Sequence, residues 1–300
     1  PALDIQGEHV IHLPMNQIAT DAGNFRAAGS VVIGAIVALF GLNLEKTEEV
    51  FVGHFAERIL DANIQSVRGG FELFESRYTL EEPTELSDMA LINGAEAMAI
   101  GALAGDMRFY SAYPMSPATS LLTYFQGLDP EAQVVVEQAE DEIAAVNMAI
   151  GASAGGVRAM TGTSGGGFSL RVEGVGLAGI AEIPLVVANV QRPGPATGLP
   201  TRTEQADLQF MIHASQGEFP RMVISPQDHL NIYHQTQRAF DIAEKYQIPV
   251  LLLSDQYLAD STSVVSLKEL QDHSAFQVAP LEQVVEIQVD ENNVYKRYQN

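Results

Sequence analysis

A carboxylate and a loop of hydroxyl and glycine residues lie close together in the middle of the chain. Glu142 is near the start of a predicted helix over residues 139–152, and residues 161–169 form a loop with the sequence TGTSGGGFS. An apolar strand is predicted just before the helix, at residues 134–136, and the whole stretch is rich in small residues. A carboxylate is costly to bury in such surroundings unless a ligand or a reaction needs it. Glu142 is therefore our first candidate for a functional residue.

Two other loops combine polar groups with prolines. Residues 113–117 read YPMSP, a stiff segment that could hold the Ser116 hydroxyl at a helix N-terminus. From these residues alone, an ordinary helix cap followed by proline explains the segment better than a functional hydroxyl. Residues 190–201 are rich in proline, glycine and threonine and contain Arg192. This arginine could bind an anionic ligand or simply pair with a surface carboxylate.

Two familiar motifs occur in the wrong context. Residues 174–179 match the dinucleotide pattern G-x-G-x-x-G, but a strand is predicted to start only a few residues later, which leaves no helix after the glycines. Close helix packing explains these glycines better. Residues 151–155 match the nucleophile pattern G-x-S-x-G, yet they end a helix instead of opening one. The histidines show no metal-ligand spacing, so we expect no metal site in this chain.

From residue 89 the chain alternates short apolar strands with helices. The strands are predicted at residues 90–92, 107–110, 134–136, 158–160, 184–190, 222–224 and 249–253. The main helices are predicted at residues 94–104, 117–126, 139–152 and 227–246. This alternation predicts an α/β fold, a parallel sheet with helices on both faces. Ligands of such sheets bind at the carboxyl ends of the strands, where the candidate loops lie.

Composition divides the chain into four parts. Residues 1–75 contain a predicted helix over residues 27–42 and a second amphipathic stretch over residues 46–62. Residues 76–87 are acidic and aperiodic, which is typical of a linker. Residues 88–260 form the predicted α/β domain. Residues 261–300 are polar, and we interpret them as a linker or as the start of a truncated following domain.

The overall charge and the missing cysteines exclude several classes of function. The 16 basic and 38 acidic residues give a net charge of −22, which argues against a nucleic-acid partner. The longest apolar run, residues 31–42, is too short to cross a bilayer, so we expect no membrane association. Without cysteine the chain has no disulfide and no thiolate ligand for zinc or an iron–sulfur cluster. No signal peptide is visible, and we expect a cytoplasmic protein. Because the chain begins with proline, we interpret it as a natural chain or a fragment.

Taken together, four segments resemble 2-oxoacid:ferredoxin oxidoreductases. They are FYSAYPMSPATS, EDEIAAVNMAIGASAGGVRAMTGTSGGGFSL, QRPGPATGLPTRTEQADL and GEFPR, in the family's order. Residues 88–258 resemble the pyrimidine-binding domain of the α subunit. Residues 1–75 resemble the C-terminal part of the γ domain, which some α subunits carry at their N-terminus. One departure is Gly166, which stands where the family motif T-S-G-P-G has proline.

The resemblance implies a cofactor site for thiamine diphosphate. Glu142 corresponds to the glutamate that binds the pyrimidine N1′ and thereby helps the 4′-amino group to take the C2 proton. Tyr113, Pro114, Thr163 and Ser164 fall at cofactor-binding positions. The expected reaction is the oxidative decarboxylation of a 2-oxoacid with coenzyme A, with electrons passed to ferredoxin.

The resemblance also implies a substrate site. Ser116 falls where the family usually has threonine, and Arg192 and Thr201 fall at substrate-binding positions. A guanidinium can donate two hydrogen bonds to the substrate carboxylate. The fused γ-like segment and the run GLPTRTEQAD resemble 2-oxoglutarate enzymes most, so we favour 2-oxoglutarate over pyruvate.

The family division of labour implies a partner. A β subunit is expected to supply the diphosphate site, Mg²⁺ and the [4Fe-4S] cluster, in an α2β2-type assembly. One alternative is a non-catalytic scaffold or regulatory relative of the pyrimidine-binding domain. Another is a different thiamine enzyme, such as a transketolase or a pyruvate decarboxylase relative. These enzymes share the glutamate, but they do not explain the Y-P-x-S/T-P and Q-R-x-G-P-x-T-G loops.

Overall fold

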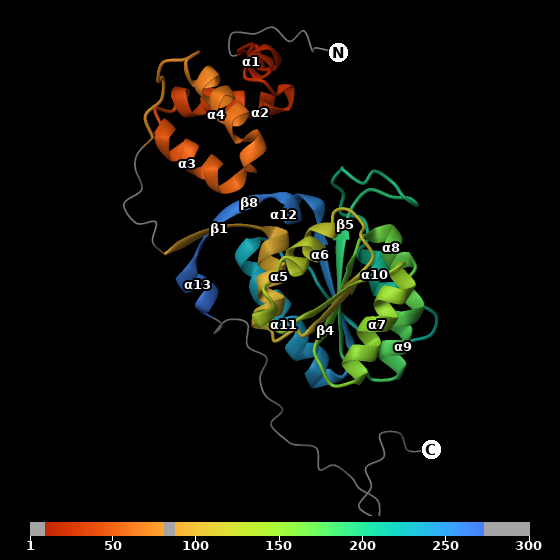
Figure 1. The fold of residues 1–300 in the computed structure, drawn as a ribbon. Helices are drawn as coiled ribbons and strands as arrows, with labels where there is room; N and C mark the ends of the chain where they lie inside the picture. Colours follow the sequence, from red (N-terminus) through yellow and green to blue (C-terminus); the bar gives the residue numbers. More distant parts are fainter. Residues whose placement is uncertain (1–9, 81–87, 273–300) are drawn as a thin grey trace, which may run out of the picture. The chain divides into compact units, whose positions relative to one another are not determined.

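The computed structural model describes residues 10–80 and 88–272 and consists of two compact units (Figure 1). The first unit comprises residues 1–84 and the second comprises residues 85–300. The division falls within the predicted linker at residues 76–87, of which residues 81–87 lie outside the described part.

The first unit is helical. Its elements are α1 (Met15–Asp21), the 3-10 turn η1 (Phe25–Ala27), α2 (Ala28–Leu39), α3 (Leu44–His54) and α4 (Glu57–Phe71). The predicted helix over residues 27–42 corresponds to α2. The stretch over residues 46–62, which we had interpreted as one amphipathic segment, is divided between α3 and α4. The division occurs because Phe55 and Ala56 have extended backbone conformations between the two helices.

Helices α2 and α4 pack with their backbones in close contact. A Cβ atom placed on Gly34 would lie 1.9 Å from the Val67 carbonyl oxygen, and one placed on Gly70 would lie 1.9 Å from the Val31 carbonyl oxygen. Side chains at these two positions would force the helices apart. The two glycines therefore set the spacing of the helices in this unit.

This contact predicts a large difference between two glycines of the same helix. We expect Gly34→Ala to lower the free energy of unfolding of the first unit by about 1–3 kcal/mol, because backbone atoms must move to make room. Gly29 has nothing within 4 Å, so Gly29→Ala should raise that free energy by about 0.5–1 kcal/mol through helix propensity. Calorimetry of the two variants checks the prediction, and equal effects would contradict it.

The second unit is built on a six-stranded parallel sheet with the strand order β3-β2-β4-β5-β7-β6. Its strands are β2 (Phe109–Ala112), β3 (Val135–Gln138), β4 (Ala159–Thr163), β5 (Leu185–Gln191), β6 (Met222–Ile224) and β7 (Pro249–Asp255). Its helices are α5 (Gly94–Ala104), α6 (Thr119–Gln126), α7 (Glu142–Ala154), α8 (Gly165–Ser169), α9 (Val172–Ile180), α10 (Leu208–His213), α11 (His229–Tyr246) and α12 (Gln256–Asp260), with a 3-10 turn η2 (Pro130–Ala132).

Helices cover both faces of this sheet, as predicted. Strand β5 shows how the faces are divided, since Val186 packs with the cluster on one face and Val187 with the cluster on the other. The first cluster contains residues of α5, α6 and α11, and the second contains residues of α7 and α9 (Figure 1). The alternation of apolar strands with helices thus produces two cores separated by the sheet.

Two strands lie outside the parallel sheet. Strand β1 (Met89–Asn93), which we had counted among the parallel strands, pairs in antiparallel register with β8 (Thr262–Ser266) in a separate two-stranded sheet. Helix α13 (Leu267–Gln271) follows. The expected linker from residue 261 therefore begins with ordered structure, and residues 273–300 lie outside the described part. Strand β8 has a single buried residue, Val265, so its local sequence pattern does not distinguish it from a loop.

No helix within residues 10–80 and 88–272 has the length and apolar character that a membrane span requires.

Candidate functional site

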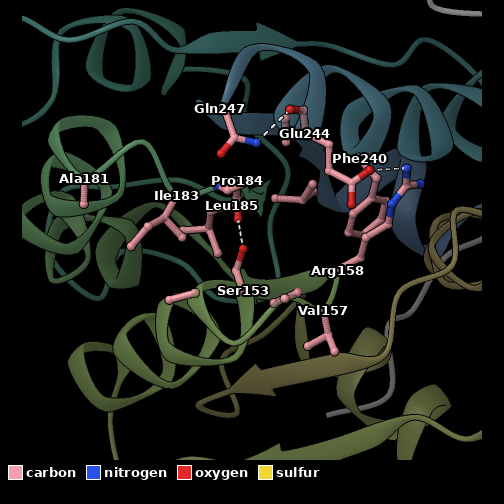
Figure 2. Close-up of a pocket in the computed structure, with 15 residues that line it drawn as sticks. Ser153, Val157, Arg158, Ala181, Ile183, Pro184, Leu185, Phe240, Glu244 and Gln247 are labelled. Carbon is pink, nitrogen blue, oxygen red and sulfur yellow. Dashed lines mark hydrogen bonds and ion pairs between the residues drawn. The ribbon is translucent and has the colours of Figure 1, made fainter. Parts of the chain in front are cut away.

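Two cavities of similar size lie at opposite edges of the parallel sheet. The amino-edge cavity, of ≈630 Å³, lies where β4 and β5 begin (Figure 2). The carboxyl-edge pocket, of ≈640 Å³, lies where β4 and β5 end. Its lining is formed by Met115, Gly165, Gly166, Ser169, Leu170, Arg192, residues 193–197, Asp207 and Phe210.

The polar groups of the amino-edge cavity are already engaged. The Arg158 guanidinium donates to the Gly105 carbonyl oxygen at 2.7 Å. It also donates to the carboxylate of Asp241 at 3.0 Å. A further bond joins it to the Glu244 carboxylate at 2.6 Å (Figure 2). Ligands of parallel α/β sheets bind at the opposite edge. We therefore place the candidate site in the carboxyl-edge pocket.

Glu142 begins α7 and is buried with one oxygen free. Its neighbour Asp141 caps the helix, because the Asp141 side chain accepts a hydrogen bond from the Ala144 amide at 2.7 Å. The Glu142 side chain is therefore not needed to cap α7. It is only 4% exposed, and its Oε1 atom has no hydrogen-bond partner. A buried carboxylate oxygen without a donor is the kind of group that a ligand satisfies.

The glycine run of α8 connects Glu142 to the carboxyl-edge pocket. Gly165 and Gly166 line the pocket. A Cβ atom on Gly167 would lie 2.9 Å from Glu142 Oε1 and 2.2 Å from Thr163 Oγ1. Only glycine lets the loop approach the carboxylate this closely.

The two hydroxyl residues before the glycine run are fully buried. Thr163 ends β4 and donates to the Ser164 carbonyl oxygen at 3.3 Å, while the Ser164 hydroxyl has no partner. Ser164 occupies the N-cap of α8 without a side-chain capping bond. The structure therefore brings Glu142 and Thr163 together against Gly167, with the Ser164 hydroxyl next in the chain.

Arg192 lines the pocket from the end of β5. It is 7% exposed, and its Nη1 atom donates to the Ser116 carbonyl oxygen at 2.5 Å, while Nε has no partner. Burial lowers the pKa of Arg192, and the Glu142 carboxylate acts in the opposite direction. The guanidinium thus joins the loops that follow β2 and β5 and keeps one donor available.

Of the predicted site residues, Arg192 lines this pocket; Glu142, Thr163 and Ser164 lie behind its glycine run, and the remaining four do not line it. Ser116 and Thr201 are exposed, Tyr113 is 39% exposed and Pro114 is half-buried. The interpretation of Ser116 as a helix cap is wrong. Helix α6 begins at Thr119 with Ala118 at its N-cap, because a turn over residues 116–118 precedes it. The binding roles of these four residues stay predictions.

Arg171 was missed by the sequence analysis and is fully buried beside the site. Its Nη1 atom donates to the Thr161 hydroxyl and its Nη2 atom to the Gly162 carbonyl oxygen at 2.9 Å. Burial lowers its pKa to about 10, and Tyr110 and Glu142 oppose that shift. Arg171 therefore stays charged at neutral pH. The sequence feature that could have identified Arg171 is its position as an arginine within a run of glycines and apolar residues.

Asp207 was also missed, and it fixes the long loop after β5 to the sheet. Its carboxylate accepts from Asn189 Nδ2 at 2.9 Å, and its amide donates to Gln191 Oε1 at 2.9 Å. Gln191 in turn donates to the Ser254 carbonyl oxygen of β7 at 3.1 Å. The loop that carries Arg192 is anchored by this network.

Gly166 leaves little room for the proline of the family motif. A Cβ atom on Gly166 would lie 2.9 Å from the Ala196 carbonyl oxygen. Ala196 has a left-handed backbone, with φ of 54°. A larger residue at position 166 would require the loop at residues 195–196 to shift.

Two protein-family models match this chain. The model described as "Pyruvate flavodoxin/ferredoxin oxidoreductase, thiamine diP-bdg" matches residues 100–297. The chain belongs to this family. The model described as "Pyruvate ferredoxin/flavodoxin oxidoreductase" matches residues 1–73. The resemblance found in the sequence is confirmed, and so is the predicted α/β fold of a thiamine-diphosphate-binding oxidoreductase domain.

Two similar proteins support this assignment. A 2-oxoacid:ferredoxin oxidoreductase α subunit of Sulfurisphaera tokodaii is 40% identical over 80% of this chain and 41% of its own length. The 2-oxoglutarate synthase subunit KorA of Archaeoglobus fulgidus is 39% identical over 63% of this chain and 55% of its own length. The chain therefore spans about two fifths to one half of the length of these relatives.

A solved structure of the same family has the same fold. It is the 2-oxoglutarate:ferredoxin oxidoreductase from Magnetococcus marinus, with 2-oxoglutarate, coenzyme A and succinyl-CoA bound. The match has a TM-score of 0.75 and 35% sequence identity. It covers 89% of this chain and 49% of that chain.

Proposed function

We propose that this chain forms the pyrimidine side of a thiamine diphosphate site in a 2-oxoacid:ferredoxin oxidoreductase. The reaction converts a 2-oxoacid and coenzyme A into an acyl-CoA, CO₂ and a proton, and two electrons leave one at a time to ferredoxin. The observation that carries the proposal is the buried Glu142 carboxylate, with its free Oε1 atom at the carboxyl edge of the sheet.

The residues around Glu142 fit a pyrimidine ring. Thiamine diphosphate, when bound, supplies a carbon nucleophile and an electron sink for the keto carbon. Glu142 would share a proton with ring atom N1′, which satisfies its free oxygen. The hydroxyl of Ser164, buried and without a partner, is a second group able to orient the ring. Because Glu142 and Ser164 are both buried, water would be kept away from the proton that Glu142 shares with N1′.

Arg192 is suited to bind the substrate carboxylate. Ser116 holds one end of its guanidinium, and the unpaired Nε atom remains for a ligand in the carboxyl-edge pocket. Because a fixed guanidinium loses little freedom on binding, it favours an anionic substrate. This arrangement supports a 2-oxoacid as the substrate class.

We expect Arg192→Met to raise the KM for the 2-oxoacid far more than it changes kcat. Loss of a charged hydrogen bond costs about 1.5–3 kcal/mol, which corresponds to roughly 10- to 150-fold in KM. Arg202→Met is the matched control, because Arg202 lies exposed in the same loop. Steady-state kinetics check the prediction. An unchanged KM in Arg192→Met would remove the arginine from the substrate site.

Among 2-oxoacids we propose 2-oxoglutarate over pyruvate. The support comes from relatives named 2-oxoglutarate synthase or oxidoreductase subunits and from the structure with 2-oxoglutarate bound. The test compares both 2-oxoacids in coenzyme A-dependent reduction of a low-potential viologen. The complete α subunit, co-purified with its β subunit, is the sample. A preference for pyruvate would overturn the substrate assignment, and no turnover of any 2-oxoacid would favour a non-catalytic scaffold.

We further propose that Mg²⁺ and the [4Fe-4S] cluster are held by the β subunit in an α2β2-type assembly. The sequence contains no cysteine. Within residues 10–80 and 88–272, no group of three or more histidine or acidic side chains is arranged to hold a metal ion. Both observations agree with metal and cluster ligands that are supplied by the β subunit.

A further inference from the structure

Arg171 is the largest fully buried side chain in the described part of the chain. It precedes α9 and reaches across to β4, where Thr161 and Gly162 accept from its two Nη atoms. The Thr161 hydroxyl donates onward to the Ser111 carbonyl oxygen at 2.6 Å, so it can only accept from Arg171. The guanidinium is therefore held in one orientation by the sheet.

No ion pair joins Arg171 to a carboxylate in the part of the chain that the structure describes. Two titratable groups influence its pKa. Tyr110, on β2, has its hydroxyl against Gly162, where an added Cβ atom would lie 2.3 Å from Tyr110 Oη. Burial raises the pKa of Tyr110, so this phenol is neutral. Glu142, on α7, is the other group and bears the opposite charge to Arg171.

The two charges lie in one connected cluster. Arg171 binds the middle of β4, and Thr163 at the end of β4 meets Glu142 at Gly167. A buried charge without a counter-charge is strongly unfavourable. The Glu142 carboxylate raises the pKa of Arg171 against the effect of burial, as a nearby opposite charge does. Each therefore lowers the cost of burying the other.

We propose that Arg171 is a positioning residue for Glu142: together with Arg192 at the pocket, it supplies buried positive charge that balances the Glu142 carboxylate and keeps its free oxygen directed at the ligand. The charge coupling is a property of the protein alone. Only the identity of the ligand as thiamine diphosphate rests on the proposed function.

A double-mutant cycle tests this coupling without any ligand. The four proteins are the wild type, Arg171→Met, Glu142→Gln and the double variant, each as the complete α subunit. Calorimetry measures the melting temperature of each protein. We expect Arg171→Met to lower the melting temperature by about 5–10 °C in the wild type and by less than half of that in Glu142→Gln.

Equal shifts in both backgrounds would overturn the proposal and leave Arg171 a purely structural residue. Arg158→Met is the control, because Arg158 is engaged at the amino-edge cavity and its effect should add to that of Glu142→Gln. If Arg171→Met does not fold, Arg171→Gln replaces it, since glutamine keeps donors for Thr161 and Gly162 without the charge. A coupling near zero in that cycle would equally overturn the proposal.

Cofactor binding provides a second readout. In the complex with the β subunit, we expect Arg171→Met to weaken thiamine diphosphate binding at least 10-fold, and to have no further effect in Glu142→Gln. If the wild-type complex does not bind thiamine diphosphate, the proposed function fails. The melting temperatures would still decide whether Arg171 and Glu142 are coupled.

Discussion

Replacing Glu142 with glutamine should lower the 2-oxoacid- and coenzyme A-dependent reduction of a low-potential viologen by about 10²–10⁴-fold. Glutamine has nearly the same size and still forms hydrogen bonds, but it cannot share a proton with a ring nitrogen. Because the Glu142 carboxylate is buried and has a free oxygen, the substitution removes an ionisable group and leaves the packing in place. The assay uses the complete α subunit with its β subunit.

Glu140→Gln is the matched control for this assay. Glu140 lies two residues earlier, is exposed, and precedes α7 instead of facing its buried side. Its replacement should leave the rate within about twofold of the wild type, because exposed charges interact weakly. If Glu142→Gln and Glu140→Gln have equal activity, Glu142 has no part in the chemistry.

The second large effect is expected at Gly167. An alanine methyl group there would lie 2.2 Å from Thr163 Oγ1 and 2.9 Å from Glu142 Oε1, and Thr163 is fully buried. One of these side chains or the loop must move. We expect Gly167→Ala to lower the free energy of unfolding of the second unit by about 1–3 kcal/mol. Displacement of the Glu142 carboxylate should also weaken thiamine diphosphate binding at least about 10-fold, as a shift of 1.4 kcal/mol would.

Gly151→Ala is the control for the effect of an added methyl group. Gly151 lies in α7, the same helix as Glu142, and has nothing within 4 Å. The substitution should raise the free energy of unfolding by about 0.5–1 kcal/mol and leave cofactor binding unchanged. Calorimetry and a titration with thiamine diphosphate measure both quantities. If Gly167→Ala binds thiamine diphosphate as tightly as the wild type, the cofactor site does not require glycine at position 167.

The parallel sheet could be predicted because its strands are short apolar runs separated by helices. The strands around Val187 and Leu251 are buried on both faces. Their continuous apolar composition is therefore enough to identify them as strands. Glu142 could be singled out for the opposite reason, since it is a charge in a run of small and apolar residues. Local composition therefore predicts the sheet and its most unusual carboxylate.

Contacts between distant segments could not be predicted in this way. Strand β8 has little apolar pattern of its own and is defined by its pairing with β1. The place of Arg171 depends on its hydrogen bonds to β4, and that of Asp207 on its bonds to β5. Ser116 was expected to cap a helix, but the turn before α6 moves the cap to Ala118. Each of these features depends on tertiary packing, which a single sequence does not display.

A crystal structure of the α subunit with its β subunit and thiamine diphosphate would show whether Glu142 binds the pyrimidine ring. We expect a Glu142 carboxylate oxygen about 2.6–3.2 Å from the pyrimidine N1′ atom. A pyrimidine ring bound elsewhere, with Glu142 hydrogen-bonded only to water or protein, would contradict this expectation.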